Sequence, residues 1–154
     1  MIWDLEECVE DAISAYLRQN VPGTMKVYEA GNFTTMEFPC VIVMCGPTQP
    51  VSETANWHDA RQMTVSVVVK SEWAHEIDGS QNTIRTAREV HAAAKGAVMS
   101  ALARVDLAER IAATQPPRVL FTMAQVNNTD VDIQDRVRST AIIVDVIASP
   151  AEAA

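Results

Sequence analysis

The residues that could do acid-base or metal chemistry in this chain are three histidines and several carboxylates. His58, His75 and His91 lie in separate segments, and none shows the HExxH or CxxC spacing that lets two metal ligands converge from one turn. We expect His58 and His75 to be solvated in loops, and His91 to be a half-buried, hydrogen-bonded residue on a helix. Five carboxylates could pair across a cleft for acid-base catalysis, although their spacing does not require it: Glu53, Asp59, Glu72, Glu76 and Asp78. The sequence therefore predicts no catalytic residue and no metal site.

Motifs that bind phosphate or calcium are missing in their usual form. The sequence contains no GxSxG, no Walker-type glycine loop and no GxGxxG, and it has only five glycines. Residues 130–135 are acidic like a calcium loop, yet the sixth position is not glycine, and Ala141 stands where a bidentate Glu belongs. We interpret this segment as a solvated acidic turn. No cofactor is predicted, and the chain is not predicted to be an enzyme.

Length and composition indicate one globular domain. The chain has 154 residues, of which 48% are hydrophobic and 21% charged, and no apolar run approaches the ~20 residues of a membrane span. We expect a single α+β domain over residues 1–149 and a flexible C-terminal tail over 150–154. Residues 1–7 lack the charged and apolar regions of a secretory signal, so we expect the chain to stay in the cytoplasm where it is made.

Charge and cysteine content argue against nucleic-acid binding and against a disulfide framework. Phosphate binding needs clustered Lys and Arg, whereas this chain has a net charge of -8. The nearest basic cluster is Arg136 and Arg138, and neighbouring aspartates neutralise it. Three cysteines without a framework spacing fit a reducing compartment, and we expect buried thiols at Cys8, Cys40 and Cys45.

The hydrophobic periodicity predicts an α+β fold: a mostly antiparallel sheet of four to five strands, packed by an N-terminal helix and a long alanine-rich helix. The N-terminal helix is expected over residues 4–20, where Asp4 and Glu7 have the form of a capping box. A long projecting loop is expected over 46–61 and a turn over 127–130. The other helices are expected over 84–105 and 106–113, and the strands over 24–29, 38–45, 63–69, 119–126 and 138–148.

Both longer helices carry an apolar stripe at helical spacing, which marks the side that each should bury. In the first helix the stripe consists of Leu5, Cys8, Val9, Ala12, Ile13, Tyr16 and Leu17. In the second it consists of Ile84, Ala87, His91, Ala94, Val98, Ala101 and Val105. Three of these seven residues are alanine, so this helix should approach its neighbours closely.

The strands over 38–45 and 138–148 carry apolar side chains on both faces. Two helices on one side can cover only one face of such a sheet. A partner subunit could cover the second face, because exposed apolar surface of that extent usually marks an interface. The alternative is that the loop over 46–61 folds back onto it. Trp57 in this loop and Trp73 after the next strand either cap the core or anchor an interface.

The order of the elements resembles that of a known family. The resemblance covers residues 4–148 and consists in the order and composition of the elements. These are an N-terminal helix, a Pro-initiated apolar strand from Phe38 to Val43, a long polar loop, a strand opened by Arg61, an alanine-rich helix and a closing strand from Arg138 to Val146. In these features the chain is similar to the tail terminator and tail-completion (neck) proteins of long-tailed bacteriophages. The resemblance implies small α/β subunits that form a ring, typically a homohexamer, which stops tail-tube growth and joins the tail to the head without enzymatic activity.

The resemblance also implies partners and a location. The partners would be copies of the chain itself, the tail-tube protein and the head-tail connector or neck proteins, without a membrane. DNA would pass through the lumen without specific binding, past acidic side chains that repel it. The chain would occur in the host cytoplasm during assembly and then in the virion.

The projecting loop over 46–61 is our candidate arm toward a neighbouring subunit or the end of the tube. Its proposed contact residues are Glu53, Trp57, His58, Asp59 and Arg61. A different class remains open: a small cytoplasmic α/β ligand-binding module that encloses an apolar molecule between the alanine-rich helix and the second sheet face. Mass in solution separates the two, because a ring is several times the monomer mass of 16.8 kDa, whereas a ligand module need be no larger than a dimer.

Overall fold

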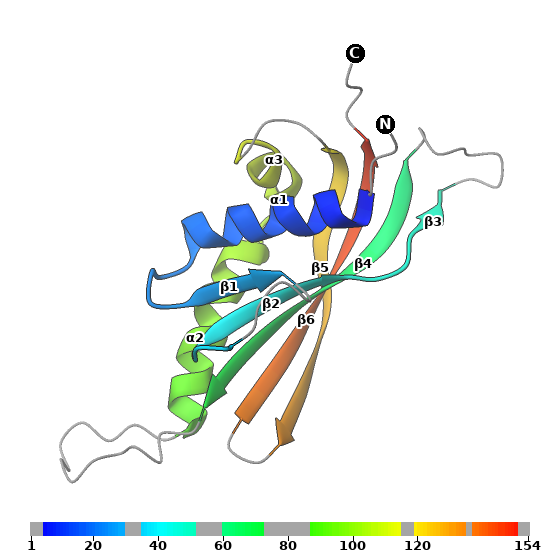
Figure 1. Ribbon diagram of the computed structural model, residues 1–154. Helices are drawn as coiled ribbons and strands as arrows, with labels where there is room; N and C mark the ends of the chain where they lie inside the picture. Colours follow the sequence, from blue (N-terminus) through cyan, green and yellow to red (C-terminus); the bar gives the residue numbers. More distant parts are fainter. Residues whose placement is uncertain are drawn as a thin grey trace, which may run out of the picture.

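The structure is a computed structural model that describes residues 5–29, 35–51, 60–72, 87–114, 119–134 and 137–150. One helix, four strands, two helices and two strands follow one another along the described part of the chain (Figure 1). The elements are α1 (Leu5–Asn20), β1 (Lys26–Glu29), β2 (Cys40–Cys45), β3 (Gln49–Pro50), β4 (Arg61–Glu72), α2 (Ala87–Leu102), α3 (Leu107–Ala112), β5 (Val119–Gln134) and β6 (Val137–Pro150).

Five strands form one sheet in the order β1-β2-β4-β6-β5, and the short β3 pairs with β4 beside this path. The expected α+β class is confirmed. The sheet is mixed, because β1 and β2 run parallel while the pairs β2–β4, β4–β6 and β5–β6 are antiparallel. The long pairing of β4 with β6 extends from Arg61 opposite Ala148 to Glu72 opposite Val137 and forms the centre of the fold.

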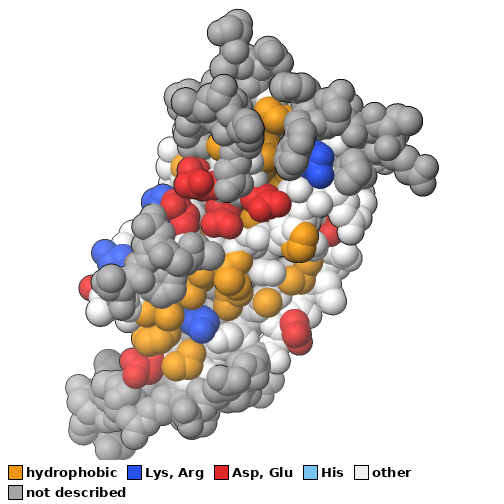
Figure 2. All heavy atoms as spheres, turned by 45° about the vertical axis from the view of Figure 1, so that its right-hand side comes forward, with side chains coloured by type: hydrophobic (Ala, Val, Ile, Leu, Met, Phe, Trp, Pro, Cys, Tyr) orange, Lys and Arg blue, Asp and Glu red, His pale blue; other side chains and the backbone are white. Residues whose placement is uncertain are grey.

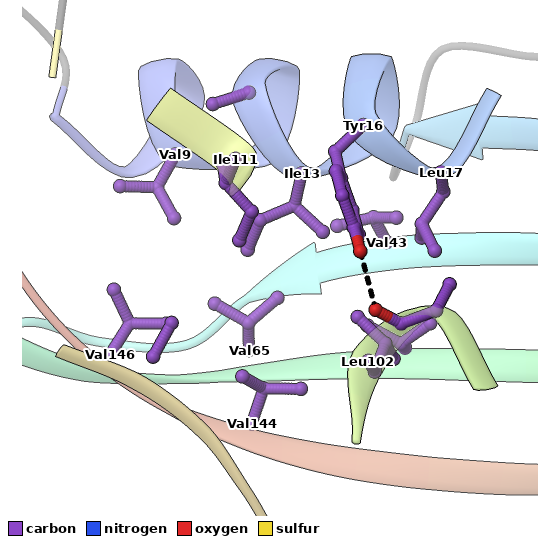
Figure 3. Packing of buried hydrophobic residues seen from close by; sticks show 14 of the residues in the cluster. Val9, Ile13, Tyr16, Leu17, Val43, Val65, Leu102, Ile111, Val144 and Val146 are labelled. Carbon is purple, nitrogen blue, oxygen red and sulfur yellow. Dashed lines mark hydrogen bonds between the residues drawn. The ribbon is translucent and has the colours of Figure 1, made fainter. Parts of the chain in front are cut away.

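Helix α1 buries the stripe that its sequence predicts. All seven stripe residues are buried in one cluster with the inward side chains of β2, β4 and β6. Figure 3 shows α1 side chains pointing toward the strands, with Val9, Ile13, Tyr16 and Leu17 on the helix side and Val43, Val65, Val144 and Val146 on the sheet side. Removal of this apolar surface from water, about 25 cal/mol per Å², holds the helix on the sheet. Asp4 lies outside the described residues, so the capping box stays a prediction.

Helix α2 differs from the long alanine-rich helix that we expected. It has 16 residues, as many as α1, and it ends at Leu102. Val105, expected on the buried stripe, is fully exposed because the chain turns away at residues 103–106, where the amide of Arg104 donates to the carbonyl of Leu102. Ala92 and Ala93 are also exposed. The buried positions of α2 are His91, Ala94, Val98, Ala101 and Leu102.

Strand β5 continues through the segment that we expected to be a turn. It reaches Gln134, and residues 130–134 are paired with β6, so the interpretation of 130–135 as an acidic turn is wrong for its described part. Irregularities between Phe121 and Met123 and between Val126 and Asn128 absorb two extra residues on the β5 side. Such bulges let a strand with turn-forming residues keep its pairing while it bends.

Candidate interaction surface

Arg61 is the member of the proposed arm that the structure describes; Glu53, Trp57, His58 and Asp59 lie outside the described residues. Arg61 begins β4, where it pairs with Pro50 of β3 on one side and Ala148 of β6 on the other. Its Nε donates a hydrogen bond to the Thr48 hydroxyl at 3.3 Å. The guanidinium therefore holds the strand that enters the arm against the strand that leaves it.

The base of the arm is a paired hairpin rather than an open loop. Gln49 lies opposite Gln62, and their side chains are hydrogen-bonded at 3.4 Å. The amide of Val51 donates to the carbonyl of Ala60 at 3.3 Å. The long projecting loop expected over 46–61 is corrected at its two ends, where β3 pairs with β4 and the described residues are strand rather than loop.

A close approach of two backbones sets the direction in which the hairpin leaves the sheet. The amide of Gly46 donates to the carbonyl of Thr64 at 2.8 Å. A Cβ at position 46 would lie 3.1 Å from that carbonyl oxygen, which is tighter than an ordinary van der Waals contact. Because glycine has no Cβ, it allows the chain to pass from β2 to β3 at this short distance from the β4 backbone.

The sheet face opposite the helix cluster is mixed rather than uniformly apolar. Strand β4 places Thr64, Ser66, Val68 and Lys70 on it, because these alternate with the valines of the core. Apolar side chains from the flanking strands surround them: Ile42, Met44, Met123, Ala141, Ile143 and Ile147. Figure 2 shows hydrophobic side chains gathered across the middle of one side of the molecule, below a group of Asp and Glu side chains.

The exposure of this face grades from one side to the other. Ile42 is 6% exposed, whereas Met44 on the same strand is 40% exposed. Ile143 and Ile147 are half-buried. Since the buried residues of all three helices belong to the cluster on the opposite side, no described helix covers this face. It presents a band of partly exposed apolar side chains interrupted by polar ones, a composition typical of a protein-protein interface rather than of a core.

A shallow groove of about 280 Å³ lies at one end of this face, near the arm. Met123, Ile147 and Met63 supply its apolar lining, and Gln62 and Asp145 supply polar groups. Within the described residues the Asp145 carboxylate has no hydrogen bond or ion pair. The groove therefore places a carboxyl group among polar and apolar side chains next to the base of the arm.

A second groove, of about 470 Å³, follows the outer edge of β5. It is lined by β5 residues 122–126 and by the connection between α2 and α3. Asp106 in that connection accepts hydrogen bonds from Arg110 at 2.8 Å and Arg104 at 3.3 Å. The hydrogen bond from Arg110 is the main cause that lowers the pKa of the Asp106 carboxyl. These ion pairs are exposed, so they orient the connection more than they stabilise the fold.

His91 has a hydroxyl partner at each of its ring nitrogens. Its Nδ1 lies 2.8 Å from the Ser71 hydroxyl, and its Nε2 lies 2.7 Å from the Thr140 hydroxyl. The three residues are buried, which makes them a structural network inside the fold rather than a nucleophile and base facing a substrate. Burial is the first cause that lowers the pKa of His91, followed by the charges of Arg138 and Lys95. The expected hydrogen bonding is confirmed, but the residue is buried rather than half-buried.

The three thiols are free, and two of them are buried as expected. Burial raises the pKa of the Cys40 thiol to about 11, against a smaller opposite effect of Lys70. Cys45 is only half-buried, with its Sγ 3.2 Å from the Met63 sulfur. In the described part of the chain no three His, Cys, Asp or Glu side chains gather as metal ligands would. Likewise, none of the described helices is long and apolar enough to span a membrane.

No protein-family model and no curated protein matches this sequence. Among solved structures, a chain from the virion of a native gene transfer agent (GTA) particle superposes with a TM-score of 0.54. The match covers 92% of this chain and 96% of that chain, at 14% sequence identity. The likeness is one of fold. A second solved structure, whose title describes no function, matches with a TM-score of 0.49 at 16% identity over 96% of this chain and 95% of that chain.

Proposed function

We propose that the chain is a non-enzymatic structural subunit of a bacteriophage-type virion, which forms a ring that ends tail-tube growth and joins the tail to the head. The observation that carries the proposal is the shared fold with a chain of the GTA virion, which extends over nearly the whole of both chains. The element order that resembles phage tail terminators supports the same assignment. Fold alone does not determine function. The proposed function depends on the surfaces through which copies of the subunit contact one another.

Two surfaces of the subunit suit the head-to-tail contacts of a ring. A heterologous interface joins two different patches and closes when its rotation permits. The first patch is the mixed sheet face with Met44, Val68 and Ile143. The second is the arm at the hairpin of β3 and β4, with Arg61 at its base. In the ring, the arm of one copy reaches the neighbouring copy or the end of the tube.

Within the arm, the proposed contact residues are those that the sequence indicated: Glu53, Trp57, His58, Asp59 and Arg61. Tryptophan and arginine are enriched among residues that dominate binding energy, which favours Trp57 and Arg61 as anchors. The groove beside the base, with Asp145, offers an anionic site for a basic group of the neighbour.

The proposal also assigns partners and a place. The ring, a homohexamer by the resemblance, contacts the tail-tube protein on one side and connector or neck proteins on the other. The net charge of -8 favours an acidic bore, through which DNA passes without sticking because like charges repel. Assembly takes place in the host cytoplasm, and the ring remains in the virion.

Shortening the arm tests the role of its tip. Replacing residues 52–59 with Asn-Gly keeps β3, β4 and the Arg61–Thr48 hydrogen bond, since Asn-Gly closes a two-residue hairpin. The control is Ser100→Ala, at an exposed position of α2 away from the arm. We expect the shortened variant to fold but to lose ring formation or capping of tail tubes, while the control keeps both. An unchanged oligomer that still stops tube growth would remove the arm tip from the mechanism.

Mass photometry separates the proposal from the ligand-binding alternative. A ring gives a species several times the 16.8 kDa of the monomer, alone or on tail tubes. A species that never exceeds a dimer, and that does not bind tubes, would favour the ligand-binding module.

A further inference from the structure

Helix α2 is attached to the rest of the fold in two different ways along its length. Its second half is held by the buried side chains of Val98, Ala101 and Leu102 and by the Tyr16 hydroxyl, which donates to the Ala101 carbonyl at 2.5 Å. Its first half is held by His91, together with Ala94. Among the described side chains of the first half, His91 and Ala94 are the buried ones, so a polar residue helps to dock that half, while apolar packing docks the other.

His91 connects α2 to two strands at once. Ser71 lies near the end of β4, opposite Arg138 of β6. Thr140 lies two residues further along β6, opposite Val69. A neutral imidazole has one N–H donor and one acceptor nitrogen. Each hydroxyl can donate or accept, so the neutral ring satisfies both of its nitrogens at 2.8 and 2.7 Å. The network is complete with His91 uncharged.

Among the described residues, the two cations whose charges act on His91 oppose its protonation. On α2, Lys95 lies one turn further along the helix, and on β6 Arg138 lies beside Thr140. Glu89 on α2 and Glu72 at the end of β4 are exposed carboxylates. From α1, the group that reaches α2 is the Tyr16 hydroxyl, at the other end of the helix. Both cations that act on the ring are therefore repulsive toward an imidazolium, and burial adds a desolvation cost.

We propose that His91 is an acid-sensitive latch, whose protonation releases the first half of α2 from β4 and β6 while the second half stays docked. The latch depends on contacts within one subunit, so it stands whether or not the chain forms a ring. The part that it frees is the N-terminal half of α2, beginning at residue 87. This half lies at the opposite end of the helix from the Tyr16–Ala101 hydrogen bond.

The direction of the pH effect follows from proton binding. The pKa of His91 is lowered in the folded state from its ordinary value of 6.5, so the opened helix binds the proton more tightly than the closed one. The contribution of the latch is complete above pH 6.5 and is lost as the pH falls from there through the folded-state pKa. With one proton involved, the opening equilibrium rises by at most about tenfold per pH unit in that window.

Hydrogen exchange, corrected for the intrinsic pH dependence of each amide, tests the latch at about pH 7.5 and about pH 5. In the wild-type protein we expect the amides of 91–95 to lose protection on acidification by up to about tenfold per unit, while those of 98–102 keep theirs. His91→Gln keeps one donor and one acceptor but cannot titrate, so it should abolish the difference between the two halves. An equal loss along all of α2, or the same selective loss in His91→Gln, would overturn the proposal.

A direct titration covers the case in which His91→Gln does not fold. The imidazole of His91 in the wild-type protein, followed by NMR, should titrate below 6.5 in step with exchange at 91–95. Thr140→Val removes one hydroxyl but keeps the shape, and it should open the first half of α2 already at neutral pH. Titration at or above the ordinary value, or a Thr140→Val helix as protected as wild type, would contradict the latch.

Discussion

Removal of the Tyr16 hydroxyl is the sharpest test of how the helix layer is held together. Tyr16 is 2% exposed, and its hydroxyl donates to the carbonyl of Ala101, in the last turn of α2. The last four carbonyls of a helix have no partner within the helix. Here the amide of Ala103 donates to the carbonyl of Met99, and the amide of Arg104 donates to that of Leu102. The Tyr16 hydroxyl donates to the carbonyl of Ala101. Tyr16→Phe therefore leaves a buried acceptor without its donor.

The magnitude follows from the cost of an unsatisfied buried group. A carbonyl that loses its only donor away from water costs about 1–3 kcal/mol, whereas loss of a solvated hydrogen bond costs little. We take about 2 kcal/mol for Tyr16→Phe, because the ring itself remains and no apolar contact is lost. For a domain of this size, about 2 kcal/mol lowers the melting temperature by roughly 4–8 °C.

Chemical denaturation of three proteins measures this cost: wild type, Tyr16→Phe and Tyr28→Phe. The Tyr28 hydroxyl accepts from the amide of Glu37 at 3.1 Å in an exposed setting, so the same chemical change there should cost less than about 0.5 kcal/mol. The two variants should keep the wild-type m-value. If Tyr16→Phe were as stable as Tyr28→Phe, the inference that this phenol ties α1 to α2 would be refuted.

Two further predictions concern the sheet and its thiols. Val65→Ala, in the fully buried core, should lower the free energy of unfolding of the dissociated subunit in urea by about 2–3 kcal/mol. Val68→Ala, on the mixed face, should lower it by less than about 1 kcal/mol and weaken self-association instead. Equal costs would contradict the assignment of the two faces. Because burial raises the pKa of Cys40 to about 11, its thiol should resist alkylation of the native protein at neutral pH while the half-buried Cys45 reacts faster, as mass spectrometry of labelled peptides would show; faster labelling of Cys40 would refute this.

Local periodicity predicted the parts of the fold that local physics determines. The stripe of α1 was predicted residue by residue, because one amphipathic helix on a sheet needs only its own spacing to define its buried side. The alternation of β4 likewise separates its core valines from Ser66 and Lys70 on the other face. In both elements the pattern and the tertiary contacts point the same way.

Elements that depend on distant partners were predicted less well. Asn127 and Asn128 have the chemistry of a turn, but Asn128 pairs with Ile143 of β6 and Asn127 is accommodated as a bulge within the strand. The two-residue β3 contains Pro50 and lies beside the main path, where strand signals in the sequence are weak. Val105 continued the helical spacing, although the chain turned at Leu102. For β5 and β3 the deciding contact is pairing with another strand, whereas α2 ends at a local turn that its apolar spacing does not reveal.

The polar network around His91 shows the same limit at a site. The stripe placed His91 correctly on α2, yet its partners lie 20 and 49 residues away in the sequence, so no local motif joins them. For the arm, the sequence indicated Arg61 as a contact residue, and the structure adds its hydrogen bond to Thr48 at the hairpin base. Whether Arg61 contacts a neighbour stays a prediction.

We propose that copies of this subunit cover the mixed sheet face of one another and close into a ring. Electron microscopy of the purified protein, alone and mixed with tail tubes, tests it most directly. We expect annular particles, free or seated on tube ends, that are lost when Ile143 at the middle of the face is replaced by Asp while the subunit stays folded. Single subunits or pairs beside tubes that continue to lengthen, or rings unaffected by Ile143→Asp, would contradict it.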